Sequence, residues 1–339
     1  YYYFDETADV LNPITFFGVF GAPTSPNSYG LDSTSNAVFG QLDWKPGAAV
    51  LQDRLTVTVG ARYTKEEKDQ YISHPIVIDN NLQVQPEWAF AGEADENWDN
   101  FSPTVTLSWE LTEQASVYAR YAEGWKSGGF NGESATLASF EKAYDPEEVA
   151  SYELGLKSRW LDNRLQVNAA AFENKVDDMQ LSIFLADGSA ASVVDNAGKA
   201  TVRGFELEML AEPVDNLLLN LSWGYLDPEY DEYIDAGVDV ADDRDFAYAP
   251  ENTFTAGAQY TLAGVLGGDL TGRLDWSYTD DRVLYTEPQQ NLHSQLDDYA
   301  LLNGRLSLTN LPVGNGSLEL AAWGKNLTDE DYRVSTIPF

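Results

Sequence analysis

Residues 54–64 read Arg-Leu-Thr-Val-Thr-Val-Gly-Ala-Arg-Tyr-Thr, and this stretch decides the fold class. Apolar side chains stand at every second position from Leu55 to Tyr63, with polar residues or glycine between them. A period of two predicts a β-strand with one apolar and one polar face. Such patterns predict about twelve strands, near residues 36–44, 54–66, 99–110, 115–123, 149–159, 163–173, 200–211, 216–226, 252–262, 269–279, 299–308 and 316–325.

The connections between these segments alternate in length. Short turns, such as 110–114 and 161–163, are followed by stretches several times longer. The long stretches are 67–98, 124–148, 174–199, 227–251 and 280–298. Compact soluble domains have connections with a median of roughly 4–6 residues, whereas up-and-down membrane barrels combine short periplasmic turns with long extracellular loops. The pattern therefore favours an all-β, antiparallel transmembrane β-barrel.

Composition narrows the class further. The 339 residues carry 20 Lys+Arg against 55 Asp+Glu, a formal net charge of −35, and nucleic-acid binding is disfavoured because it requires a basic face. With 43% hydrophobic residues the chain is too apolar to remain disordered. No apolar window approaches the ~18 residues of a spanning helix, whereas barrel strands need only about 9–11 residues. The absence of cysteine removes disulfides, thiolate zinc sites and cysteine nucleophiles.

Tryptophans gather near the predicted strand ends, as in the girdles that place indole rings at the headgroup level of a membrane. They are Trp44, Trp98, Trp109, Trp125, Trp160, Trp223 and Trp276. A soluble β-sandwich also has alternating strands and stays open as an alternative. It does not explain why both the length and the acidity of the connections alternate.

Four stretches resemble, in this order, the barrel of TonB-dependent outer-membrane receptors. They are residues 117–132 (VYARYAEGWKSGGFNG), 144–157 (YDPEEVASYELGLK), 200–208 (ATVRGFELE) and 323–332 (WGKNLTDEDY). The resemblance implies a barrel in the bacterial cell outer membrane. It also implies that the barrel takes up an iron–siderophore complex or another bulky nutrient with energy passed from the inner membrane.

Barrels of that family have about 22 strands around a globular plug, and nothing in this sequence resembles a plug. We therefore expect residues 1–339 to form a C-terminal barrel portion of about 12–14 strands out of roughly 22, without the N-terminal plug. The last strand or two are expected to be missing. Pro338 would remove a ladder donor just before Phe339, so Phe339 is expected to be a truncation point.

In such a barrel the polar stripe lines a watery interior and the apolar stripe faces lipid. The expected interior charge ladder consists of Arg120, Glu153, Lys157, Arg159, Glu206 and Glu208. Gly204 is expected on the same side, where another backbone approaches closely. Phe205, Leu207 and Met209 are expected to face lipid.

We expect a protein that is not an enzyme and that needs no cofactor. His74 and His293 lie in predicted loops, and no Gly-x-Ser-x-Gly elbow, phosphate loop or paired-histidine helix occurs. Residues 227–245 hold nine acidic side chains against Arg244 alone, without the spaced ligands of a calcium loop. A solvated loop is favoured there, with divalent ions bridging to lipopolysaccharide as an alternative. A negative mouth disfavours anionic cargo and leaves neutral or cationic cargo open.

Cargo contact is predicted for two lumen residues near the outer rim and for the start of the following loop. The six residues are Tyr118, Arg120, Trp125, Lys126, Phe130 and Asn131. Plain packing of the rim is the alternative role for them. The expected partners are outer-membrane lipid and lipopolysaccharide, a TonB complex acting through a plug outside this chain, and a bulky cargo such as a ferric siderophore. A porin-like passive diffusion channel and a soluble, aromatic-rich β-sandwich that binds glycans stay open as alternative functions.

Overall fold

The computed structural model describes residues 1–12, 27–47, 53–75, 86, 89–132, 134, 136–184, 192–235, 237–292 and 294–335. These residues form one antiparallel sheet of 14 strands. The strands are β1 (Tyr2–Asn12), β2 (Asn27–Trp44), β3 (Leu55–His74), β4 (Phe90–Glu110), β5 (Ala115–Lys126), β6 (Glu147–Trp160), β7 (Leu165–Phe184), β8 (Ser192–Val214), β9 (Leu217–Asp235), β10 (Val238–Asp239), β11 (Asn252–Val265), β12 (Gly268–Thr279), β13 (Tyr299–Val313) and β14 (Gly316–Gly324).

Neighbours in the sheet are neighbours in the sequence. The order runs from β1 to β9 and then from β11 to β14, while the two-residue strand β10 pairs with β9. The helices α1 (Leu137–Phe140) and α2 (Pro288–Asn291) are single turns, as is the 3₁₀ segment η3 (Ala241–Asp243). No helix in the described part of the chain is long and apolar enough to cross a membrane.

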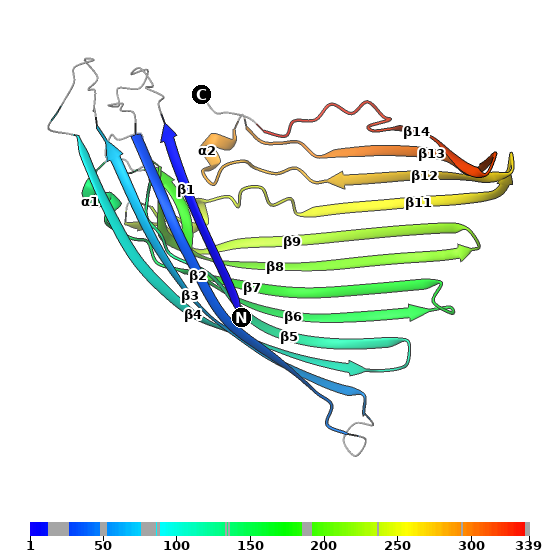
Figure 1. The fold of residues 1–339 in the computed structure, drawn as a ribbon, viewed down its shortest axis with the longest axis horizontal. Coiled ribbons are helices and arrows are strands. Elements are labelled where there is room, and N and C mark those ends of the chain that lie inside the picture. Colours follow the sequence, from blue (N-terminus) through cyan, green and yellow to red (C-terminus); the bar gives the residue numbers. More distant parts are fainter. Residues whose placement is uncertain are drawn as a thin grey trace.

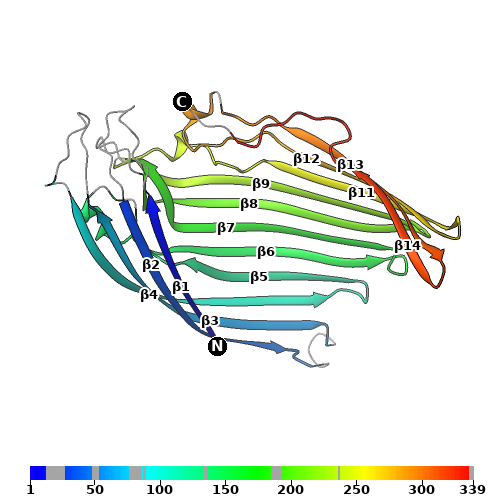
Figure 2. The ribbon, with the colours of Figure 1, turned by 45° about the horizontal axis from the view of Figure 1, so that its top comes forward.

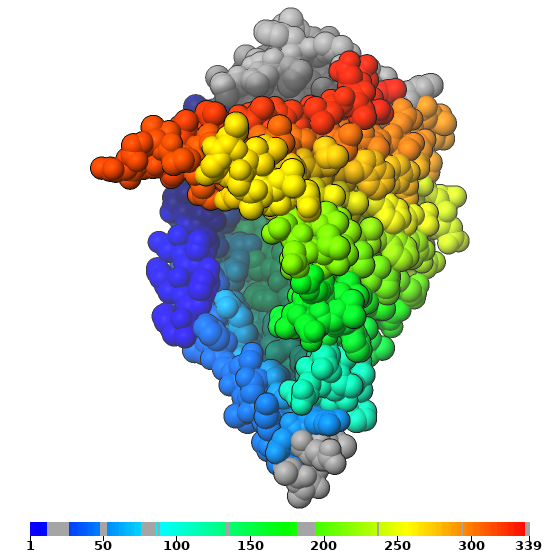
Figure 3. All heavy atoms as spheres, turned by 90° about the vertical axis from the view of Figure 1, so that its right-hand side faces the viewer, coloured from blue at the N-terminus to red at the C-terminus, as the bar shows by residue number. Residues whose placement is uncertain are grey.

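The sheet curves into an open trough with β1 and β14 at its two edges (Figures 1 and 2). Short turns gather at one end, on the right of Figure 1, and long connections at the other. We call these the short-turn end and the loop end. Seen from the short-turn end, the trough encloses a hollow between β1–β2 and β6–β9 (Figure 3). Within the described residues β1 and β14 each pair on one side only, so the sheet is part of a barrel wall.

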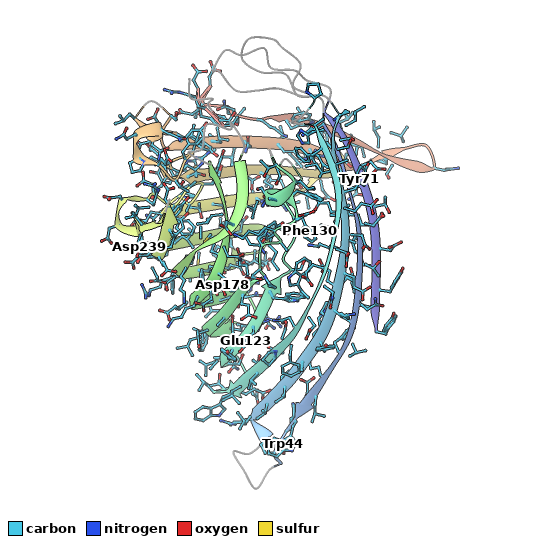
Figure 4. All side chains as sticks on the ribbon, turned by 90° about the vertical axis from the view of Figure 1, so that its left-hand side faces the viewer. Trp44, Tyr71, Glu123, Phe130, Asp178 and Asp239 are labelled. Carbon is cyan, nitrogen blue, oxygen red and sulfur yellow. The ribbon has the colours of Figure 1, made fainter. Side chains whose placement is uncertain are left out.

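The apolar stripe of the strands faces outward from the trough. Ile72 of β3 packs with Phe130, and Figure 4 shows Phe130 inside the trough. Because side chains alternate along a strand, Thr58, Gly60 and Arg62 also face inward, and Leu55, Val57 and Val59 face outward. The predicted polarity of the two faces is therefore confirmed.

No protein packs over this apolar face among the described residues. Val59 is 48% exposed, Leu154 66% and Leu274 53%, whereas a soluble β-sandwich would bury such side chains against a second sheet. A continuous exposed apolar surface of this kind fits hydrocarbon. The structure therefore rules against the β-sandwich alternative.

Two aromatic bands border the apolar surface. Phe101 and Trp109 lie eight residues apart on β4, and Tyr152 and Trp160 are spaced alike on β6. Eight residues span about 26 Å along a strand, or about 20 Å across the membrane when the strand tilts by ~40°. This height is close to the ~25 Å apolar band of outer-membrane barrels.

Two of the predicted girdle tryptophans do not belong to these bands. Trp98 is buried on the inner side of the trough, and Trp125 packs against the same inner cluster. The prediction was wrong for them because β4 and β5 extend beyond the apolar band, so a position near a predicted strand end is no longer at the headgroup level.

All twelve predicted segments coincide with observed strands, four of them with an end one or two residues outside the strand, but most strands are longer than predicted. β3 continues to His74, β4 starts at Phe90, and β8 starts at Ser192. β1 was not predicted at all. These extensions have water or loop residues on both faces, so their sequences lack the alternation that marks the membrane-spanning parts. The connections are correspondingly shorter than the sequence indicates.

Candidate functional site

The connection between β5 and β6 folds into the trough instead of outward. We call residues 127–146 the strap, and the structure describes all of them except 133 and 135. Its two arms are joined by a β-bridge in which Gly129 N–H donates to Tyr144 O at 3.2 Å and Tyr144 N–H donates to Gly129 O at 2.9 Å. Helix α1 lies between the arms, and its cap forms where Ser139 N–H donates to Thr136 Oγ1 at 3.2 Å.

A hydrophobic cluster attaches the strap to β3 and β4. Ile72 and Trp98 from the wall meet Phe130 and Phe140 from the strap, and Ile72 and Phe140 are 1% and 0% exposed. The Phe130 ring centroid lies 6.3 Å from that of Trp98 and 6.1 Å from that of Phe140. Further apolar side chains pack against this cluster: Tyr29, Phe90, Ala94, Trp125, Leu137 and Ala143.

Lys68 of β3 forms a polar tie to the strap from the same wall. Its Nζ donates to Ser127 Oγ at 2.7 Å and to Gly128 O at 2.8 Å, and lies 3.2 Å from Glu66 Oε1. The Ser127 hydroxyl also donates to Glu66. The Lys68 and Glu66 side chains are only 17% and 21% exposed, so this ion pair is largely shielded from water.

The opposite wall holds the strap through amide side chains. Gln180 of β7 donates from Nε2 to Ser127 O at 2.9 Å and to Asp145 O at 3.0 Å. Asn131 of the strap pairs with the backbone of Val194 in β8 through bonds of 2.9 and 2.7 Å. Asn196 of β8 accepts from Asp145 N–H at 2.6 Å and donates to Asp145 O at 2.8 Å. The strap therefore links β3 to the neighbouring strands β7 and β8, which lie four and five places away in the sheet order.

The structure does not bring the six predicted contact residues together. Trp125 and Phe130 share the hydrophobic cluster, and Asn131 ties the strap to β8. Lys126 is exposed and lies opposite Glu147 in the β5–β6 register.

Tyr118 and Arg120 face the interior as predicted, but the prediction that they lie near the outer rim was wrong. β5 begins at Ala115 at the short-turn end. Val117 lies opposite Trp109, which belongs to the aromatic band nearer the short-turn end. Tyr118 is only the fourth residue of β5 and therefore lies near the short-turn end, whereas the outer rim is at the loop end.

Around Tyr118 the interior wall carries the predicted charged residues. Tyr118 Oη donates to Glu153 Oε1 at 2.5 Å, and Lys157 Nζ lies 5.4 Å from the ring centroid. The ring covers Gly155, where a Cβ would lie 2.2 Å from Tyr118 Cε1. The wall at this level carries polar and ionisable side chains, as a hydrated lumen requires.

Gly204 also faces inward as predicted, but the group that approaches it most closely is not the predicted backbone. A Cβ there would lie 2.3 Å from Cζ of Phe172, the closest atom, and 2.8 Å from Tyr225 O. The close approach is thus mainly an aromatic side chain of the neighbouring strand, with a backbone carbonyl second.

Sequence reasoning did not identify three residues whose side chains bind the strap, namely Lys68, Gln180 and Asn196. The predicted strand pattern ends before all three, so they fall in what the sequence indicates as loops. No local signal identifies a lysine or an amide as the partner of a segment 50 or 60 positions away.

The acidic stretch 227–245 uses several of its carboxylates within its own turns. Asp239 accepts from Tyr233 N–H and Ala241 N–H, both at 3.1 Å, and these bonds hold the pKa of Asp239 below its usual value. Asp235 pairs with Arg244 at 2.7 Å. In the described ranges no three His, Cys, Asp or Glu side chains are grouped to hold a metal ion. His293 lies outside the described residues.

One mainly apolar groove lies on the outer face. It has a volume of about 720 Å³ and is lined mainly by apolar groups such as Leu274, Leu306 and Leu327. Since these side chains belong to the lipid-facing stripe, the groove fits acyl chains and is not a candidate for polar cargo.

Acidification is expected to weaken the loop end through His74. Its ring stacks on Phe90 with centroids 4.5 Å apart, and burial lowers its pKa below the usual 6.5. The unfolded chain therefore binds a proton more readily, so stability falls as the pH drops through about 6.5. We expect the urea midpoint of the protein to fall more between pH 7.5 and 5.5 in the wild type than in His74→Phe, which keeps a ring. Equal pH dependence in both proteins would contradict this assignment.

Lys68→Met is expected to destabilise the protein by about 1–2 kcal/mol, because Glu66 and the Gly128 carbonyl lose their partner in a largely buried place. The matched control is Lys65→Met. Lys65 Nζ lies 2.5 Å from Glu67 Oε1, but the pair is half exposed, so its loss is expected to cost clearly less stability than the loss of Lys68. Urea unfolding measures both, and the assignment fails if the two variants lose the same stability.

The chain was compared with known families and proteins. The family model described as "TonB dependent receptor-like, beta-barrel" matches residues 1–327. A curated relative, the probable TonB-dependent siderophore receptor PiuA of Acinetobacter baumannii, is 27% identical over 189 residues, which are 53% of this chain and 23% of that protein. The metal-pseudopaline receptor CntO of Pseudomonas aeruginosa is 30% identical over 128 residues, 38% of this chain and 17% of that protein.

Solved structures agree with the fold. The ferric yersiniabactin uptake receptor FyuA of Yersinia pestis aligns with a TM-score of 0.70 at 19% identity, over 92% of this chain and 43% of that one. The matched segments span about a quarter or less of the two curated relatives, 23% of PiuA and 17% of CntO. Because the family model covers nearly all of it, the chain belongs to the TonB-dependent receptor β-barrel family, whose members are outer-membrane receptors and not enzymes.

Proposed function

We propose that this chain is the C-terminal barrel portion of a receptor for TonB-energised uptake of a bulky nutrient, an iron–siderophore complex. The single observation that carries the proposal is the inward-folded strap in a polar lumen. A packed segment tied to three strands narrows and shapes the interior, as a site for one bulky solute requires. The relatives PiuA, CntO and FyuA are named as receptors for siderophores or metal complexes.

In this proposal the loop end captures cargo and the interior wall guides it inward. Tyr118, Arg120 and Lys126 would contact the solute, while Trp125, Phe130 and Asn131 shape the site by fixing the strap. A plug outside this chain would close the lumen and be displaced by the TonB complex.

The two sheet edges support the need for further strands. Unpaired backbone groups cost several kcal/mol each in hydrocarbon, and β1 and β14 each pair on one side only in the described part. Outer-membrane lipid would cover the convex face. Lipopolysaccharide is the proposed neighbour of the loop end, with divalent ions between its phosphates and the surface carboxylates.

Uptake of radiolabelled iron complexes tests the proposal in the native strain. Deletion of the complete gene is expected to reduce uptake of one neutral or cationic iron–siderophore at least tenfold, and loss of TonB is expected to have the same effect. Anionic siderophores serve as the comparison arm, because the acidic loop end repels them. Uptake that persists without TonB would favour passive diffusion and contradict the proposal.

A further inference from the structure

We infer that the strap is a fixed shelf which stays attached to the barrel wall during uptake, so that cargo passes beside it and does not displace it. This inference rests on the proposed function. It concerns how the lumen selects its cargo, because a fixed shelf sets the width of the passage whereas a moving one would act as a gate.

The first reason is that the strap is attached on several sides. Lys68 binds its first arm from β3, Gln180 binds both arms from β7, and Asn131 and Asn196 bind it to β8. A gate swings on one edge and leaves the others free. Here release on any side breaks at least two hydrogen bonds.

The second reason is the close packing within the strap and between the strap and the wall. A Cβ at Gly128 would lie 2.2 Å from Tyr144 O and 2.6 Å from Trp98 Cε2. A Cβ at Gly132 would lie 2.6 Å from Tyr29 Cδ2. On the wall itself, Leu137 of α1 fills the space where Gly92 would carry a side chain, with Leu137 Cδ1 2.3 Å from that position. Such close packing has one arrangement and is not continuously deformable.

The third reason is that strand pairing continues to both ends of the strap. None of the described residues from 115 to 160 has a positive φ, so the strap joins β5 and β6 through ordinary backbone conformations. Its ends continue paired strands, since Lys126 lies opposite Glu147 in the register. Hinges are a few positions that absorb large backbone changes, and pairing up to the last strand residue leaves no such position at the base of the strap.

A covalent lock tests the inference. The chain has no cysteine, so Gly92→Cys combined with Leu137→Cys places two new thiols between β4 and α1. These are joined by a short thiol-specific crosslinker in the complete receptor in cells. A fixed shelf predicts iron–siderophore uptake within twofold of the untreated double variant. A tenfold loss that appears only after crosslinking would overturn the inference. The single variants with the same reagent are the controls.

A second lock guards against poor assembly of the first. Asn131→Cys with Val194→Cys replaces the tie to β8 with a covalent one, and the expectation is the same. Failure of the shelf can be distinguished from failure of the proposed function, because the attachment of the strap is also measured without any transport. Hydrogen exchange at the amides of Gly129 and Tyr144 is expected to be as slow as in β6, with or without cargo. Exchange that accelerates tenfold or more when cargo binds would overturn the shelf even if the cargo is not an iron–siderophore.

Discussion

Val59→Arg is expected to prevent normal assembly of the receptor in the outer membrane. Val59 lies on the convex face, four residues from both Leu55 and Tyr63 and opposite Val105, which places it midway between the aromatic bands. Arginine at the bilayer midplane on the lipid face of a barrel costs about 2–4 kcal/mol, equivalent to a roughly 30- to 900-fold shift in the folding equilibrium. Heat-modifiable mobility on gels measures the folded fraction in isolated outer membranes.

The adjacent residue supplies the control. Thr58 faces the interior, and its hydroxyl donates to Asp43 Oδ1 at 2.6 Å. Arginine at that position would meet water and a carboxylate, so we expect Thr58→Arg to assemble within about 1 kcal/mol of the wild type. Equal damage from both substitutions would mean that the two faces do not differ in environment.

Gly128→Ala is expected to destabilise the loop end by about 2–3 kcal/mol through overpacking. The added methyl group would meet the Tyr144 carbonyl oxygen and the Trp98 ring at once. A backbone carbonyl cannot rotate away, so the Gly129–Tyr144 bridge must open or the strap must shift. Hydrogen exchange at Gly129 and Tyr144 is expected to accelerate by more than tenfold.

Gly124→Ala is the matched control four residues earlier. Nothing lies within 4 Å of a Cβ at Gly124, and the residue is in β5, where alanine loses less backbone entropy on folding than glycine. We expect unchanged or slightly slower exchange. If Gly124→Ala and Gly128→Ala disturb the strap alike, the close packing described above is not what holds it.

The membrane-spanning part of the fold is predictable from sequence for a physical reason. Where one face of a strand meets hydrocarbon and the other meets water, every second residue is constrained, as in residues 54–64. Beyond the bilayer neither face meets hydrocarbon, so the constraint disappears, and the extension of β3 through Lys65–Gln70 carries charges on both sides. β1 was missed for the same reason, because Asp5, Glu6 and Asp9 interrupt its apolar pattern.

The site is less predictable than the fold. Resemblance points to residues 117–132 as important, but it gives no indication that this segment turns into the lumen. That outcome depends on Lys68, Gln180 and Asn196, which contact the strap from strands distant in sequence. Phe130 and Asn131 therefore look from sequence like exposed loop residues suited to cargo, while in the structure they anchor the strap.

The most direct test of the account is the environment of successive residues along β6. Nitroxide labels at positions 152 to 158, one at a time, report collisions with oxygen, which is concentrated in lipid, and with a water-soluble nickel complex. We predict an alternation, with oxygen contact greatest at 152, 154 and 156 and nickel contact greatest at 153, 155 and 157. Uniform accessibility, or the opposite phase, would contradict the assignment of the apolar face to lipid and of the charged face to the lumen.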